Sequence, residues 1–113
     1  MISFVGLSRP YNHAVPPGRP QPLRRFVVAD RSMEPTLVEG QGLITSRYGR
    51  VKPGQLRCFE HPQRPGFWLV KRVVRVSGDR MDLASDNPVG TDFSGVHVAG
   101  SYRVLLAIPR RLM

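Results

Sequence analysis

Turn-forming residues interrupt this chain at close intervals, and they limit the folds that it can adopt. The 113 residues include 11 Gly and 11 Pro with no fixed period. No stretch between them keeps apolar residues at the spacing of 3.6 that an amphipathic helix requires. Gly and Pro instead separate short apolar runs, which is typical of strands joined by turns. The length suits a single domain, and we expect it to be mainly β, a compact coiled antiparallel sheet or barrel with little helix.

The turn signals divide the chain into an arm and a folded part. Residues 1–25 contain five Pro and four Arg but no acid, and we expect them to form a basic, disordered arm. Residues 26–113 would then be the folded β domain. Within it, residues 85–95 are rich in Asp, Asn, Pro and Gly, and we expect a loop there. The expected strands are 26–29, 43–47, 55–60, 67–76, 80–83, 97–99 and 102–108.

The formal charge is +9, from 17 basic and 8 acidic residues. Such a charge favours an acidic partner, either nucleic acid, an anionic membrane surface or an acidic protein. The arginines are scattered and lie on no expected helix, so we do not expect nucleic-acid binding. No apolar run reaches the roughly 20 residues that span a bilayer. We therefore expect a cytoplasmic protein with, at most, peripheral contact to an anionic membrane.

The remaining composition argues against disulfides and cofactors. Cys58 is the only cysteine, so no internal disulfide can form. No group of His, Cys, Asp and Glu has the spacing of metal ligands, and the chain has no complete Gly-rich phosphate loop. We therefore expect neither a metal nor a cofactor.

A serine next to a strand end is the first candidate for chemistry. Ser32 follows the apolar run 26–29 and precedes Pro35, which forbids an ordinary helix there. A serine hydroxyl is a poor nucleophile at neutral pH unless a base lies beside it. His61 and His97 lie next to turns, and neither position suggests a Ser-His-Asp arrangement. Taken alone, such a serine is more often a turn or helix-cap residue.

A lysine inside the expected strand 67–76 is the candidate base. Residues two apart share a face of a strand, so Lys71 would lie between Leu69 and Val73. Burial on that apolar face would remove hydration from the ammonium and favour the neutral amine, which can accept a proton. Lys52, the only other lysine, lies in a Pro-Gly turn and should be solvated. The alternation alone also allows a surface lysine on an edge strand.

Three segments, in this order, resemble a known protease family. Residues 32–37, Ser-Met-Glu-Pro-Thr-Leu, resemble the nucleophile box Ser-Met-x-Pro-Thr-Leu of the type I signal peptidases. Residues 71–73, followed by Gly78-Asp79, resemble the lysine box of that family, and Ser85-Asp86-Asn87 stands where the family has Gly-Asp-Asn. The resemblance covers residues 26–109. It implies the coiled β fold of signal peptidases, endopeptidase activity with a Ser/Lys dyad, and cleavage after small residues.

The resemblance also implies roles by position. Ser32 would be the nucleophile, with its backbone N–H as an oxyanion donor, and Lys71 would be the general base. Asp30 stands where larger members have a second oxyanion hydroxyl, but an ionised carboxylate cannot donate, and its charge would favour a charged lysine. Thr91, four residues after Asn87, occupies the position of a serine that hydrogen-bonds the lysine.

Further residues would support this site. By resemblance, Met33 would line the floor of the cleft, with Thr36 and Leu37 behind it. Asp86 and Asn87 would shape the loop that presents the hydroxyl of residue 91, and the same residues would also suit an ordinary Asx-type turn.

Three functions fit these observations. The first is a serine endopeptidase that binds a precursor polypeptide as an added strand and removes a leader or signal segment. The chain most resembles small bacterial proteases that mature nickel-type superoxide dismutase. The second is a self-cleaving, repressor-type regulator, although residues 1–25 are too short and Pro-rich for a helix-turn-helix. The third is a non-catalytic basic β module that binds nucleic acid or an acidic protein.

Overall fold

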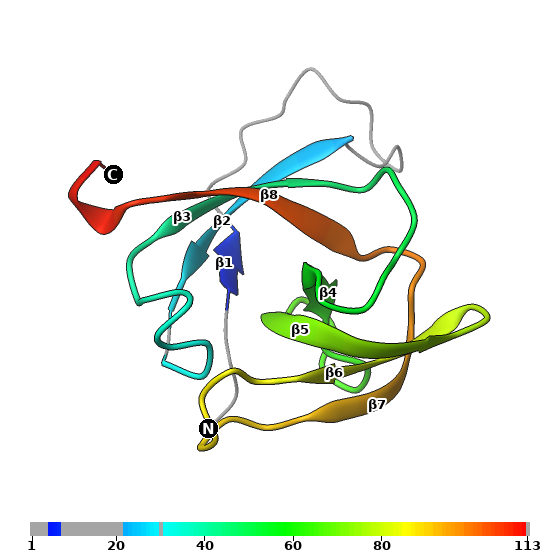
Figure 1. The fold of residues 1–113 in the computed structure, drawn as a ribbon. Helices are drawn as coiled ribbons and strands as arrows, with labels where there is room; N and C mark the ends of the chain where they lie inside the picture. The colour runs from blue at the N-terminus through cyan, green and yellow to red at the C-terminus, as the bar shows by residue number, and fades with distance from the viewer. Residues whose placement is uncertain (1–4, 8–21, 30, 113) are drawn as a thin grey trace.

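The strands of the protein form one antiparallel sheet that curls on itself. The computed structural model describes residues 5–7, 22–29 and 31–112. They form an 8-stranded sheet with the order β1-β2-β3-β8-β4-β5-β6-β7. The sheet bends so that its edge strand β1 comes to lie against β5 (Figure 1). The elements are β1 (Val5–Leu7), β2 (Leu23–Val28), β3 (Gly42–Ser46), β4 (Leu56–Glu60), β5 (Trp68–Ser77), β6 (Arg80–Ala84), β7 (Phe93–His97), β8 (Tyr102–Ile108) and the 3-10 helix η1 (Arg110–Leu112).

The expected mainly β fold with little helix is confirmed. η1, of three residues, is the only helical element in the described part of the chain. No helix among the described residues has both the length and the apolar character needed to cross a bilayer. The turn before β4 shows why the chain reverses where Gly and Pro occur. Gly54 has a φ of 94°, in the left-handed region that glycine tolerates.

Two apolar cores lie on opposite faces of β4 and β5. Val70 faces the first core, whereas Leu69 and Val73 face the second. The first core consists of Phe26, Val28, Met33, Leu37, Leu43, Cys58, Val70 and Tyr102. The second consists of Phe59, Leu69, Val73, Met81, Leu83 and Val96. Each large apolar side chain buried in this way contributes roughly 1.5–3 kcal/mol. β5 is thus covered on both faces where it carries Lys71.

The strand expected at 97–99 was misplaced. β7 runs over Phe93–His97 instead and takes up the end of the expected loop 85–95. The carboxylate of Asp82 accepts hydrogen bonds from Gly95 N (2.8 Å) and Ser94 Oγ (3.0 Å). The ring of Phe93 also packs edge-on against Phe59 in the second core. These tertiary contacts hold residues 93–97 against β6, and they have no signature in the local sequence.

Two strands lie within residues 1–25, where we expected an arm without regular structure. Residues 5–7 form β1, and β2 begins at Leu23, three residues before the expected start of the domain. β1 pairs with β2, with Leu7 opposite Phe26. Residues 1–4 and 8–21, the rest of the expected arm apart from Pro22, lie outside the described residues.

Candidate active site

Ser32 lies in a tight turn between β2 and β3. The turn is closed by hydrogen bonds from Glu34 N to Arg31 O (3.1 Å) and from Leu37 N to Met33 O (2.9 Å). The side chains of Met33 and Leu37 are buried in the first core and fix the turn to the sheet. Ser32 itself is 2% exposed. The sequence favours this local structure because Pro35 prevents the turn from continuing as a helix.

Asn87 connects this turn to the loop that follows β6. Its backbone N–H donates to Ser32 O (2.8 Å), and its side-chain amide donates to Arg31 O (2.9 Å). Its own Oδ1 accepts from Val89 N (3.2 Å), and its carbonyl accepts from Gly90 N (2.9 Å). One side chain therefore shapes its own loop, as an Asx turn does, and also holds the backbone of the serine.

Lys71 projects from β5 toward both segments. The residue is 0% exposed, so of the two interpretations that the alternation of Leu69 and Val73 allowed, the buried one holds. Its Nζ lies 3.4 Å from Ser32 Oγ and 2.6 Å from Ser85 Oγ. The longer distance is at the upper limit of a hydrogen bond, which is common for catalytic pairs without substrate. The structure thus brings together the two side chains, 39 residues apart, that the sequence singled out.

Ser85 is the site residue to which the sequence analysis gave no role. Its hydroxyl donates to the carbonyl oxygen of Thr91 (3.1 Å) and accepts from Lys71 Nζ. The expected orienting hydroxyl was that of Thr91, whose described hydrogen bond at this site is made by its carbonyl. The register of the β5–β6 hairpin could have revealed Ser85. Because Arg72 pairs with Ala84, the next residue pair along the hairpin is Lys71 and Ser85.

Gly90 is a second residue that the sequence analysis missed. A Cβ atom at this position would collide with Cβ and Oγ of Ser85 and would lie 2.8 Å from Ser32 Cβ. Real Cβ atoms essentially never come within 3.0 Å of another heavy atom. Only glycine therefore lets the loop after β6 approach the two serines this closely.

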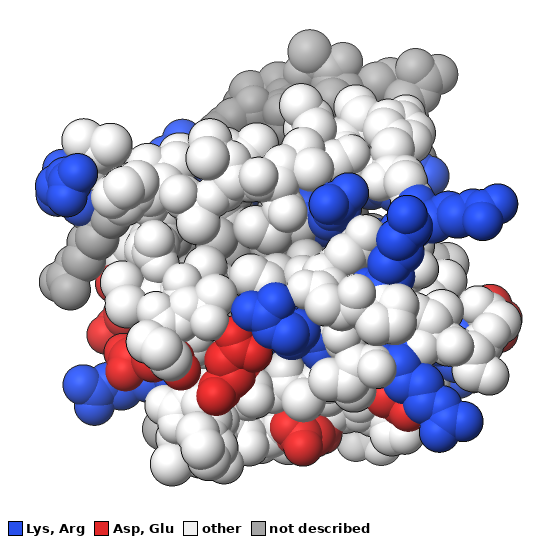
Figure 2. Space-filling model, in the orientation of Figure 1, with Lys and Arg blue, Asp and Glu red and all other residues white. Residues whose placement is uncertain are grey.

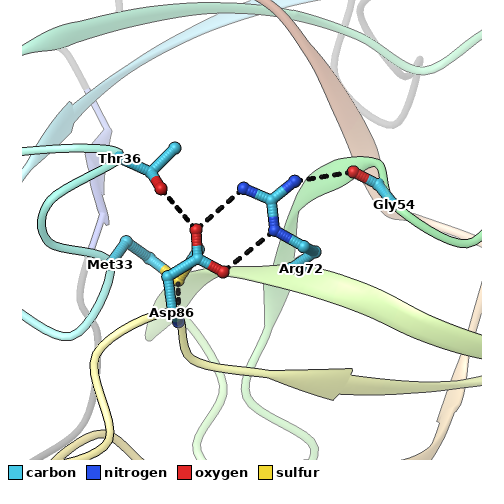
Figure 3. A network of polar contacts seen from close by, with 5 residues as sticks. All are labelled: Met33, Thr36, Gly54, Arg72 and Asp86. Carbon is cyan, nitrogen blue, oxygen red and sulfur yellow. Dashed lines mark hydrogen bonds and ion pairs between the residues drawn. The ribbon is translucent and has the colours of Figure 1, made fainter.

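An ion pair beside Lys71 and Ser85 joins several segments of the chain (Figure 3). Arg72 donates from Nε and Nη2 to the two carboxylate oxygens of Asp86 (2.9 and 2.7 Å) and from Nη1 to Gly54 O (2.8 Å). Asp86 also accepts from Thr36 Oγ1 (2.5 Å), and its backbone N–H contacts Met33 Sδ (3.3 Å). This network connects the serine turn, β5 and the loop after β6.

The charges of the ion pair stabilise each other. The hydrogen bonds from Arg72 hold the pKa of Asp86 below its ordinary value. The same hydrogen bonds raise the pKa of Arg72. Because the carboxylate of Asp86 is engaged by the guanidinium, its charge is largely compensated by Arg72 rather than by the amine of Lys71.

The other expected site residues have different outcomes. Met33, which we expected in the floor of a cleft, is 0% exposed and belongs to the first core. Asp30 lies outside the described residues. His61 packs edge-on against the rings of Phe67 and Phe93. Over the described ranges, no three His, Cys, Asp or Glu residues are grouped as ligands for a metal ion.

Known protein families provide an independent comparison. The model of the family described as signal peptidase, peptidase S26, matches residues 20–102. The match covers more than half of the 113 residues and includes Ser32, Lys71 and the loop after β6. Comparison with curated proteins and with solved structures gave no match. The chain therefore belongs to the signal peptidase family, peptidase S26.

Proposed function

We propose that the protein is a serine endopeptidase that cleaves a leader or signal segment from a precursor polypeptide, with Ser32 as nucleophile and Lys71 as general base. The observation that supports this most directly is the fully buried Nζ of Lys71 at 3.4 Å from Ser32 Oγ. An amine without exposed surface loses its hydration, and desolvation favours the neutral form that accepts a proton. Proton transfer between these two side chains requires no cofactor.

The proposed reaction follows from these two groups. Lys71 takes the proton of the Ser32 hydroxyl as Oγ attacks the scissile carbonyl carbon. The negative charge moves to the carbonyl oxygen, where the backbone N–H of Ser32 can stabilise it. The carbon–nitrogen bond then breaks, and the protonated Lys71 gives its proton to the leaving amine. Lys71 next takes a proton from a water molecule, which attacks the acyl carbon bound to Ser32. The bond between Ser32 Oγ and that carbon then breaks, and the protonated Lys71 returns its proton to Oγ.

Ser85, Asn87 and Gly90 are proposed as positioning residues. The oxygen of Ser85 holds the Lys71 amine at 2.6 Å, and Asn87 fixes the backbone of the nucleophile through Ser32 O. Gly90 allows both serines to approach the same loop. Thr91 supports Ser85 through its carbonyl oxygen, and a hydroxyl role for Thr91 remains part of this proposal. Such positioning matters because small displacements of reacting groups cost large factors in rate.

The substrate is proposed to be a polypeptide bound in an extended conformation beside the site, with small side chains before the scissile bond. A narrower proposal is that the substrate is the precursor of a nickel-type superoxide dismutase. Its support is the resemblance of this compact chain to the small proteases that mature that enzyme. Cleavage of a peptide that spans the leader junction of such a precursor would distinguish it from a generic signal segment.

The test is to replace each member of the dyad and measure peptide cleavage. Ser32→Ala and Lys71→Met should each lower kcat by about 10³-fold or more, because neither residue can act without the other. Ser46→Ala is the matched control, since Ser46 is also buried but accepts its hydrogen bond from Tyr48 N. Circular dichroism checks that each variant is folded. Cleavage retained by a folded Ser32→Ala variant would overturn the mechanism, and a falling intact mass of the protein alone would indicate self-cleavage instead.

A further inference from the structure

A large cavity lies apart from the dyad and plays no part in the proposed chemistry. Its volume is about 860 Å³, and none of Ser32, Lys71 and Ser85 lines it. The start of β2, the loop between β3 and β4, the start of β4, both ends of β5 with the turn that follows it, and the turn before β8 form its walls. These segments are distant in sequence but meet on one side of the sheet (Figure 1).

The cavity is strongly basic. Four arginines line it, namely Arg24, Arg47, Arg50 and Arg57, and no Asp or Glu does so among the described residues. Figure 2 shows basic side chains gathered at the upper right, beside the β3–β4 loop, whereas the acidic side chains of that face lie mainly in its lower half. Like charges brought together around one hollow repel one another, so an anion in the hollow would stabilise them.

Arg57 carries a buried charge with no carboxylate partner in the described structure. The residue is 2% exposed. Its Nε donates to Ser101 Oγ (2.9 Å), Nη2 to Ser101 O (3.3 Å) and Nη1 to Gln55 Oε1 (3.2 Å). Burial, and then the charge of Arg103, lower the pKa of Arg57. A buried guanidinium that has only neutral partners is costly, and a carboxylate or another anion would offset that cost.

Arg24, near the start of β2, is oriented by three aromatic rings. Its guanidinium carbon lies 4.5 Å from the ring centroid of Trp68, 5.2 Å from that of Phe26 and 5.3 Å from that of Tyr102. Cation–π contacts of this kind orient a guanidinium while leaving its edge N–H groups available to an acceptor. The guanidinium of Arg24 therefore lies over these rings on the side that it faces.

We infer that this cavity binds an acidic segment, rich in Asp or Glu, of the polypeptide substrate at a distance from the scissile bond. The inference rests on the proposed function for the nature of the substrate. The hollow shape and the apolar wall formed by Trp68, Tyr102 and three valines suit carboxylate side chains with aliphatic stems. Nucleic acid fits less well, because single-stranded bases bind by stacking on aromatic faces, and Arg24 covers these. A flat membrane surface would not reach a recessed guanidinium such as that of Arg57.

The test measures binding without cleavage. The protein carries Ser32→Ala, and the probe is a fluorescein-labelled peptide rich in Asp and Glu, followed by fluorescence anisotropy. Arg50→Glu should raise Kd by about tenfold or more, because a charge-assisted hydrogen bond is replaced by repulsion. Arg111→Glu is the matched control, since Arg111 is also exposed and the charge change is the same, but η1 lies on the other side of the molecule (Figure 1). A peptide with Asn and Gln in place of Asp and Glu should not bind.

The results separate this inference from the proposed function. Equal loss of binding in Arg50→Glu and Arg111→Glu would overturn the inference, because the attraction would then depend on net charge alone. The inference would also be overturned if the acidic peptide did not bind, while random-sequence DNA or anionic vesicles bound and this binding was lost in Arg50→Glu. In the active enzyme, Arg50→Glu should raise KM about tenfold for a substrate with an acidic segment and leave kcat unchanged. If no substrate is cleaved, the proposed function fails, while the binding result still decides whether the cavity takes an acidic polypeptide segment.

Discussion

The amine of Lys71 lies 2.6 Å from the hydroxyl oxygen of Ser85, which is closer than its 3.4 Å distance to Ser32 Oγ. Ser85 donates its own proton to Thr91 O, so its oxygen acts as the acceptor toward the amine. The lysine is therefore held by one serine and directed at another. The contribution of Ser85 to the position of the Lys71 amine can therefore be measured by removing its hydroxyl.

Replacing Ser85 with Ala should lower kcat by about 10- to 100-fold while the protein stays folded, because the amine loses its nearest partner. An acceptor stabilises the charged form of an amine, so its removal should also move the acid limb of the pH–rate profile to lower pH. Steady-state kinetics across pH checks both effects. Ser94→Ala, whose hydroxyl donates to Asp82, serves as control. A Ser85→Ala profile that coincides with that of the wild type would limit Ser85 to a structural role.

Gly90→Ala should disturb the site by adding a methyl group to the loop after β6. The added Cβ would need space that Ser85 and Ser32 occupy, so one of them must move. We expect a loss of at least about tenfold in kcat/KM and a destabilisation of roughly 1–3 kcal/mol from overpacking. Val89→Ala is the control, because the Val89 side chain is largely exposed. Kinetics and thermal unfolding measure the two effects, and an unchanged kcat/KM in Gly90→Ala would contradict the close approach.

Acidification should weaken the fold through the Arg72–Asp86 pair. The pKa of Asp86 is lowered in the folded state by the hydrogen bonds from Arg72. Its contribution is therefore fully present above the ordinary pKa of an unfolded Asp, about 3.9, and is lost as the pH falls through the lower folded value. Thermal unfolding from neutral pH downward should show a smaller acid dependence for Asp86→Asn than for the wild type. The exposed Asp79 provides the control Asp79→Asn, which should retain the dependence of the wild type.

The thiol of Cys58 should be inert in the native protein. Cys58 is fully buried in the first core, and burial raises the pKa of the thiol, so little of the reactive thiolate forms. A disulfide reagent such as dithiobisnitrobenzoate should label it only after unfolding in guanidinium chloride. Rapid labelling of the native protein, at the rate of a free cysteine, would contradict this prediction.

Local pattern was sufficient for part of the fold and of the site. Gly and Pro marked the turns, and the strand expected at 102–108 coincides with β8, where a short apolar run lies between turn signals. The alternation of Leu69 and Val73 placed Lys71 on an apolar face of its strand, since alternation needs no knowledge of neighbouring strands, but it also allowed a surface lysine, and the structure shows the residue buried. The turn at Ser32 followed from Pro35, whose ring restricts the backbone by itself.

The sequence by itself thus determined the class of fold, the turn that holds Ser32 and the face on which Lys71 lies. Only the tertiary structure decided that Ser85 is the nearest partner of the amine, that position 90 must be glycine, and that residues 93–97 form a strand. It also decided that four scattered arginines line one cavity. The physical reason is that these features depend on strand register and on the approach of loops distant in sequence. Such contacts are set by the packing of the whole sheet and not by the residues on either side of each position.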